Sequence, residues 1–234
     1  MINEFRFDSK EALLNCLYDD ALECIGADLE HSGKATILLS GGSTPGPLYE
    51  RLSKAELDWA NVHVALVDER WVEPDHTASN ERLIKQTLQQ NNAAASSFIG
   101  MKNASKTPFE GQLECNAQYQ LLPQPYSFCL LGMGGDGHTA SLFPHAQGLT
   151  EALASQQLCA GILAKPSDVT GVNLERMTMT PQAILQSKKV VLLITGDDKW
   201  AVYEQARVNS QVEDTPVSVF LQQHHVDIDV YWAP

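Results

Sequence analysis

The stretch LLGMGGDGHTASLFP, residues 130–144, decides the fold because a buried strand runs directly into a glycine-rich loop. The apolar run Phe128–Leu131 predicts that strand, and the loop matches the dinucleotide-binding pattern G-x-G-x-x-G. That pattern needs a long following helix, whereas Pro144 leaves only about six residues for one. We therefore interpret the loop as a turn of backbone N–H groups that presents His138 as a general base. Asp136, two residues away, can orient His138 or raise its basicity.

Strand and helix patterns alternate along the rest of the chain. Short apolar runs predict strands at Ala35–Leu39, Val62–Val67, Cys159–Leu163, Arg176–Met179 and Val190–Thr195. Helical patterns occupy Pro47–Ser53, Asn80–Gln90 and Asp197–Val208, and further helices start at Thr107-Pro108 and Thr180-Pro181. This alternation predicts an α/β fold, a doubly wound and mostly parallel sheet with helices on both faces, in which residues 1–234 form a single domain. Ligands of such folds bind at the carboxyl ends of the strands.

Three further segments have a predicted structure. Asp8 with Glu11 reads as a capping box that opens the first helix. Asn91–Lys106 is polar, and we expect it to be irregular. Val226–Trp232 alternates apolar and acidic residues, which predicts an edge strand with one face in water.

The composition excludes several classes of protein. Sixteen basic and 29 acidic residues give a net charge of −13, which argues against general nucleic-acid binding and against docking on anionic lipid. The five cysteines are odd in number and scattered, as expected of reduced thiols in a cytoplasmic protein. The start of the chain shows no signal-peptide pattern, and no apolar run is long enough to span a membrane.

The loop after the first predicted strand, Ser40–Gly46, suits an anion. Gly41 and Gly42 let several N–H groups converge, Ser43 and Thr44 add hydroxyl donors, and a helix start follows. The loop lacks the Gly-Lys-Ser/Thr of a Walker A motif. A plain turn with a helix cap is the alternative.

Charged residues follow the other predicted strands. Asp68, Glu69 and Arg70 come directly after the second strand, where either a substrate site or a solvated turn is possible. Arg176 lies in a later strand, and Lys199 opens a later helix. A single cation is usually only solvated, but in an acidic chain an anionic ligand requires local positive charge.

Metal and serine-nucleophile chemistry have little support. His138 and His145 lack zinc-ligand spacing, and Ser43 lacks the G-x-S-x-G elbow because residue 45 is proline. We expect no metal and no cofactor.

Six motifs in order resemble one known family. They are SGGSTP (40–45), VDERWV (67–72), SNERL (79–83), LLGMGGDGHTASLFP (130–144), RMTMT (176–180) and TGDDK (195–199). Between about residues 38 and 220 the chain resembles the 6-phosphogluconolactonases, within a larger group that also holds glucosamine-6-phosphate deaminase. The resemblance implies a doubly wound α/β fold and hydrolysis of 6-phospho-D-glucono-1,5-lactone to 6-phosphogluconate, the second step of the oxidative pentose phosphate pathway.

The resemblance also implies roles for the singled-out residues. His138 would activate water, while Asp68, Arg70 and Asp136 would line the lactone end of the site. The 6-phosphate would be held by the loop with Gly41, Gly42, Ser43 and Thr44, together with Arg176 and Lys199. Lactone hydrolysis needs a base and donors for the developing oxyanion. Either Arg70 or the N–H groups of residues 134–137 can be those donors.

Two other functions remain open from the sequence. One is a sugar-phosphate deaminase or isomerase on the same scaffold, and the other is a sugar-phosphate sensor without catalysis. The resemblance implies that the deaminases carry an extra carboxylate where this chain has Phe143. We expect a small sugar-phosphate substrate, no nucleic-acid or membrane partner, a cytoplasmic location, and either a monomer or a weak dimer.

Overall fold

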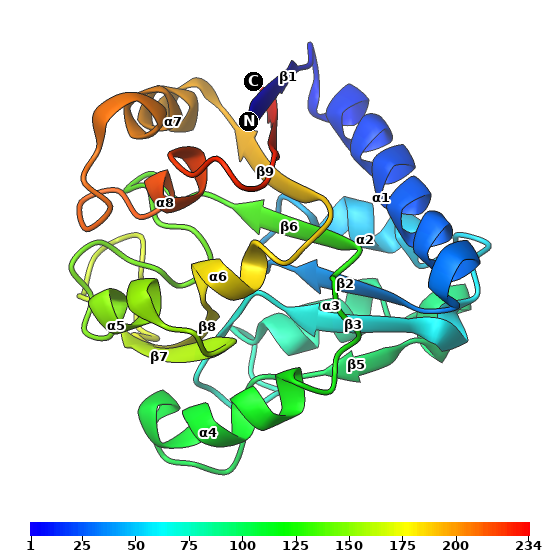
Figure 1. The fold of residues 1–234 in the computed structure, drawn as a ribbon, viewed down its shortest axis with the longest axis horizontal. Helices are drawn as coiled ribbons and strands as arrows, with labels where there is room; N and C mark the ends of the chain where they lie inside the picture. The colour runs from blue at the N-terminus through cyan, green and yellow to red at the C-terminus, as the bar shows by residue number, and fades with distance from the viewer.

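A sheet of seven parallel strands forms the centre of the protein. The computed structural model describes residues 1–234, apart from the side chain of Asn209. The strand order is β1-β10-β9-β6-β2-β3-β5 (Figure 1). The strands are β1 (Ile2–Arg6), β2 (Ala35–Leu39), β3 (Val62–Leu66), β5 (Ser97–Ile99), β6 (Phe128–Gly132), β9 (Val190–Thr195) and β10 (Ile228–Ala233). The predicted α/β class with a mostly parallel sheet is confirmed.

The strand order reverses between β2 and β6. From β2 the chain proceeds outward to β3 and β5, whereas from β6 it proceeds in the opposite direction to β9 and β10. Loops that leave neighbouring strands at such a reversal diverge and open a crevice at the carboxyl ends. The SGGSTP loop follows β2 and the glycine loop follows β6, so both loops border this crevice.

A second, antiparallel sheet has the order β4-β8-β7. It consists of β4 (Asp68–Arg70), β7 (Cys159–Leu163) and β8 (Glu175–Met179). Figure 1 shows β7 and β8 beyond the carboxyl ends of β2 and β3. Because β4 begins only two residues after β3 ends, the small sheet is held close to the crevice. The strands predicted at residues 159–163 and 176–179 exist, but they belong to this second sheet.

Eight α-helices and two short 3₁₀ turns connect the described strands. They are α1 (Lys10–Ser32), α2 (Gly46–Leu52), α3 (Asn80–Thr87), α4 (Pro108–Tyr119), α5 (Leu149–Ala154), α6 (Pro181–Ile184), α7 (Asp197–Asn209), α8 (Ser218–Leu221), η1 (Trp59–Asn61) and η2 (Asn91–Ala95). In α1, residues 13, 17, 21 and 25 recur every fourth position and are buried in the core. None of the described helices is long and apolar enough to cross a membrane.

Three sequence predictions were wrong in detail. Ser9, not Asp8, caps α1, because the Ser9 hydroxyl accepts a hydrogen bond from the backbone N–H of Ala12. The segment 91–106 is not wholly irregular, since it contains η2 and the edge strand β5. β10 is an inner strand, between β1 and β9. Asp229 in β10 is buried, and its ion pair with Lys189 at 2.5 Å compensates the burial of its charge. The alternation of apolar and acidic residues in this strand therefore does not mark a face in water.

The start of α4 packs directly against β7 at Gly161. A Cβ atom at Gly161 would lie 2.9 Å from the backbone N of Phe109, which is closer than the two atoms can approach. We expect Gly161→Ala to lower the free energy of unfolding by about 1–3 kcal/mol, as overpacking does. Chemical denaturation measures this change.

Gly26→Ala is the matched control. Gly26 lies inside α1, and a Cβ atom there meets nothing within 4 Å. The control should stabilise the protein by about 0.5–1 kcal/mol, because alanine favours a helix interior. Equal effects of the two substitutions would contradict the packing argument.

Candidate active site

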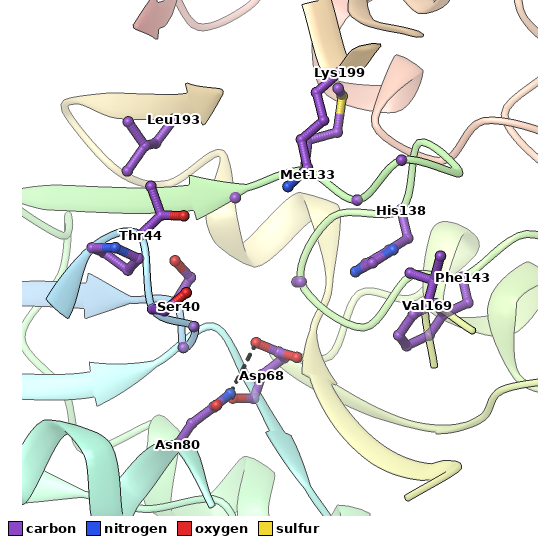
Figure 2. A pocket seen from close by; sticks show the side chains of 18 of the residues that line it. Ser40, Thr44, Asp68, Asn80, Met133, His138, Phe143, Val169, Leu193 and Lys199 are labelled. Atoms are coloured by element: carbon purple, nitrogen blue, oxygen red, sulfur yellow. Dashed lines mark hydrogen bonds between the residues drawn. The ribbon is translucent and has the colours of Figure 1, made fainter. Parts of the chain in front are cut away.

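A cleft of about 400 Å³ occupies the crevice at the carboxyl ends of β2 and β6. Of the ten residues singled out in the sequence, nine line the cleft: Gly41, Gly42, Ser43, Thr44, Asp68, Arg70, His138, Arg176 and Lys199. Figure 2 shows Ser40, Thr44, Asp68 and Asn80 on one side of the cleft and His138, Phe143 and Val169 on the other. The tenth residue, Asp136, does not line the cleft and lies behind His138, in contact with its ring.

The SGGSTP loop between β2 and α2 exposes its polar groups to the cleft. Ser43 and Thr44 are exposed, whereas Ser40 is buried, with its carbonyl oxygen accepting a hydrogen bond from the Tyr49 hydroxyl at 2.6 Å. Gly42 has a φ of 101°, a conformation that favours glycine. The loop therefore has a fixed base and free donors at its tip, which suits an anionic ligand.

The glycine loop after β6 holds His138 by its Nδ1 atom. That atom lies 2.6 Å from Asp136 Oδ1, which leaves Nε2 as the nitrogen without a partner inside the loop. Gly134 is required beneath the ring, since a Cβ atom there would lie 2.1 Å from His138 Nδ1. Burial raises the pKa of Asp136, but the hydrogen bonds and charge of His138 outweigh burial and hold that pKa below its ordinary value. A carboxylate in this position orients the imidazole and supports a charge on it.

Phe143 packs against both His138 and Arg176. Its ring centroid lies 4.3 Å from that of His138, with the planes inclined by 33°, and 5.3 Å from Arg176 Cζ. The Phe143 side chain is only 3% exposed, so it forms an apolar wall beside the imidazole. The contact restrains the plane of the His138 ring. It adds no acid or base beside the imidazole, because phenylalanine neither gives nor takes a proton.

Two arginines lie directly opposite each other across the small sheet. Arg70 of β4 pairs in register with Arg176 of β8. Arg176 donates to the carbonyl oxygens of Asn173 (2.7 Å) and Thr170 (3.0 Å), and Arg70 donates to that of Ala78 (2.6 Å). The pKa of the Arg176 guanidinium is lowered to about 10, chiefly by burial; the charge of Asp68 opposes this lowering, and the charge of Arg70 adds to it.

No carboxylate neutralises these cations by direct pairing. Among the described side chains, no ion pair within 4.0 Å involves Arg70, Arg176 or Lys199. Like charges placed opposite each other destabilise a sheet, so the pairing of these two arginines opposes folding. An anionic ligand in the cleft offsets this repulsion, in a protein whose net charge of −13 otherwise repels anions.

Asp68 and Asn80 form a polar pair that the sequence did not single out as a unit. Asp68 Oδ2 accepts a hydrogen bond from Ser141 Oγ at 2.6 Å, and Asn80 Nδ2 donates to the Asp68 carbonyl oxygen at 2.8 Å (Figure 2). Asn80 also lies against the SGGSTP loop, since a Cβ atom at Gly41 would be 1.9 Å from Asn80 Oδ1. Asn80 belongs to the motif SNERL, but its sequence position at a helix start gives no sign of this contact.

The cleft therefore combines a base, a group of unpaired cations and a hydroxyl-rich loop. This combination defines an enzyme site for a small phosphorylated or carboxylated substrate. Over residues 8–232 the chain matches the family described as "Glucosamine-6-phosphate isomerases/6-phosphogluconolactonase". The chain belongs to this family.

The similar proteins point to one branch of the family. The chain is 34% identical to a 6-phosphogluconolactonase of Rhizobium meliloti over 97% of both chains. It is 35% identical to a 6-phosphogluconolactonase of Pseudomonas putida over 96% of this chain and 90% of the other. A crystal structure of a 6-phosphogluconolactonase from Shewanella baltica is 36% identical and superposes with a TM-score of 0.94, covering 100% of this chain and 98% of that one. A monomeric glucosamine-6-phosphate deaminase, 19% identical with a TM-score of 0.79, shares the fold.

Proposed function

We propose that this protein hydrolyses 6-phospho-D-glucono-1,5-lactone to 6-phosphogluconate, with His138 as the base that activates water. The observation that supports this mechanism is that His138, Arg70 and Arg176 line the same cleft. His138 is oriented there by Asp136, and neither arginine forms an ion pair with a described side chain. Several relatives are named 6-phosphogluconolactonases, and this chain is similar to them over nearly their whole length. These similarities support 6-phosphogluconolactone as the substrate. The substrate is a charged metabolite of central carbohydrate metabolism, and we place the reaction in the cytoplasm, within one domain of residues 1–234.

The free Nε2 of His138 takes a proton from water as the water oxygen attacks C1 of the lactone. The C1 carbonyl becomes an oxyanion, then the bond between C1 and the ring oxygen breaks, and that oxygen takes the proton back from His138. The product is an open-chain acid. No cofactor is needed for this sequence of steps, because a base and an oxyanion donor are sufficient.

Arg70 is the better candidate for the oxyanion donor. Its Nε atom is buried and has no hydrogen-bond partner among the described residues. The N–H groups of Gly134 and Gly137 are already used inside the glycine loop, donating to His138 O (2.9 Å) and Gly134 O (3.1 Å). The Arg70 guanidinium lines the cleft and makes one hydrogen bond to the described residues, to the Ala78 carbonyl oxygen, so it has further N–H donors for a ligand. The geometry therefore favours Arg70 over the amides of Gly134 and Gly137.

The phosphate of the substrate would bind between the SGGSTP loop, Arg176 and Lys199. Ser43 and Thr44 offer hydroxyl and N–H donors, and the two cations come from β8 and from the first turn of α7. A planar guanidinium suits paired contacts to phosphate oxygens, while lysine supplies a point charge. This assignment predicts that phosphate recognition and base chemistry can be separated by mutation.

His138→Ala should reduce kcat by at least about a hundredfold, the usual contribution of a general base. A coupled assay on freshly prepared phospholactone measures the rate after the spontaneous hydrolysis has been subtracted. The matched control is His145→Ala, because His145 is half-exposed, pairs with Asp214 and does not line the cleft. Near-normal kcat in His138→Ala would remove His138 from the mechanism.

Arg176→Ala should raise KM for the phosphorylated lactone and leave the hydrolysis of unphosphorylated gluconolactone almost unchanged. The expected loss corresponds to about 1.5–3 kcal/mol, the contribution of a hydrogen bond to a charged group. Arg207→Ala serves as the control, since Arg207 pairs with Glu4 away from the cleft. Equal losses on both substrates would instead assign Arg176 to the structure of the small sheet.

The protein should release no ammonia from glucosamine 6-phosphate. A deaminase must open a sugar ring and move a proton between carbons, which needs further acid–base groups. In this cleft Phe143 stands beside His138 and cannot transfer a proton. Ammonia release at a rate comparable to lactone hydrolysis would overturn the assignment, as would a lactone hydrolysis rate equal to that of buffer alone.

A further inference from the structure

Glu69 is a buried carboxylate that lies directly behind the cleft. It is the middle residue of β4, between Asp68 and Arg70, and only 1% of it is exposed. Successive side chains of a strand point to opposite faces, so Asp68 and Arg70 line the cleft while Glu69 does not. The mechanism outlined above does not use Glu69.

Four donors converge on the two oxygens of this carboxylate. Oε1 accepts from the backbone N–H groups of Arg70 (2.7 Å) and Asn80 (2.8 Å). Oε2 accepts from the backbone N–H of Glu81 (2.8 Å) and from Ser79 Oγ (2.9 Å). Three of the four donors belong to the peptide backbone and cannot become acceptors, so only the ionised carboxylate can accept all four hydrogen bonds at once.

These hydrogen bonds join the strand of the site to the first turn of α3. Through Asn80 they reach both the Asp68 carbonyl oxygen and Gly41 of the SGGSTP loop. Arg70 holds the same turn from its other side, by donating to the Ala78 carbonyl oxygen. Glu69 thus connects the lactone end of the cleft with its phosphate loop.

The charge of Glu69 is costly to the fold. Burial raises its pKa to about 7, against the opposing effect of the four hydrogen bonds. Because the pKa in the folded state lies above the ordinary value of 4.5, protonation favours folding, and this stabilisation is lost as the pH rises through about 7. Because the charge of Glu69 lowers the stability of the fold at neutral pH, stability alone does not explain why a glutamate occupies this position.

We propose that Glu69 is a positioning residue for lactone hydrolysis, whose ionised carboxylate fixes Asp68, Arg70 and Asn80 relative to the phosphate loop. The proposal rests on the function proposed above. It assigns Glu69 no contact with the substrate, since its effect passes through the backbone of β4 and α3.

Glu69→Gln tests the need for charge without changing shape. Glutamine has one acceptor oxygen, so its amide NH₂ must face donors on the other side. We expect kcat/KM to fall by at least about tenfold at about pH 8, because small displacements of reacting groups are expensive. The assay is run well below the melting temperature and expressed per folded molecule, so a loss of stability alone does not change the result.

The pH dependence separates positioning from packing. The ratio of wild-type to Glu69→Gln kcat/KM should be large at about pH 8 and approach one at about pH 5.5, because the wild-type carboxylate is then protonated. Every other residue is the same in the two proteins, so a pH effect that does not come from residue 69 cancels in the ratio. The charged or titratable groups around Glu69 are also common to both: Asp68 and Arg70 on β4, Glu81 on α3, Arg176 on β8 and Tyr119 on α4. A ratio of one at every pH, or a reduced ratio that does not vary with pH, would overturn the proposal.

Asp28→Asn is the matched control for this substitution. Asp28 is also a buried carboxylate, paired with Lys188 beside the amino end of β9 and away from the cleft. It should lower the melting temperature without changing kcat/KM. Loss of activity in both variants alike would mean that any buried carboxylate matters, and the specific role of Glu69 would be wrong.

A second pair of variants serves if Glu69→Gln does not fold. Ser79→Ala removes one donor to Glu69 and the cap of α3, whereas Thr107→Ala removes the equivalent cap of α4. Both should lower the melting temperature by similar amounts, but only Ser79→Ala should reduce kcat/KM, by about threefold for one hydrogen bond. Equal kcat/KM values would overturn the proposal. If the wild-type protein itself does not hydrolyse the lactone, the proposed function fails instead.

Discussion

The reversal of strand order between β2 and β6 is the constraint on which the site depends. In a parallel sheet every carboxyl end lies at the same edge, but only at a reversal do the following loops separate and leave space for a ligand. Here one of those loops carries the exposed Ser43 and Thr44, and the other carries His138. The loops to which we assign anion binding and base chemistry therefore follow adjacent strands that are about ninety residues apart in sequence.

The small antiparallel sheet contributes charged side chains to the cleft, which otherwise lies between loops of the large sheet. It brings Arg70 and Arg176 into register, and this places two cations side by side without a carboxylate partner. Like charges that face each other across a sheet repel, but this pairing concentrates positive charge in a strongly acidic chain. Stability and anion binding are therefore opposed at this pair of arginines.

Local signals in the sequence were sufficient for most elements but not for their partners. The buried runs of β2, β6 and β9 and the Thr107 cap of α4 follow from residue pattern alone. β10 was misread as an edge strand because the partner of Asp229, Lys189, and the covering strand β1 come from other parts of the chain. Nine of the ten residues singled out in the sequence line the cleft, because each lies at or near an end of a predicted strand or the start of a helix. The contacts of Asn80 and Glu69 could not be predicted in this way. Those contacts depend on the tertiary position of α3.

The chemistry of the cleft is limited by how few of its groups can accept a proton. Of the residues that line it, only Asp68 and His138 have a side-chain carboxylate or imidazole that can accept a proton, since the other ionisable residues are Arg70, Arg176 and Lys199. Asp68 is engaged by Ser141 through Oδ2, whereas His138 keeps Nε2 free. A reaction that opens a sugar ring and also moves a proton between carbons needs further acid–base groups, while attack of water on a carbonyl needs one base. The arrangement thus suits hydrolysis, with Phe143 excluding a second proton-transfer group from the position beside His138.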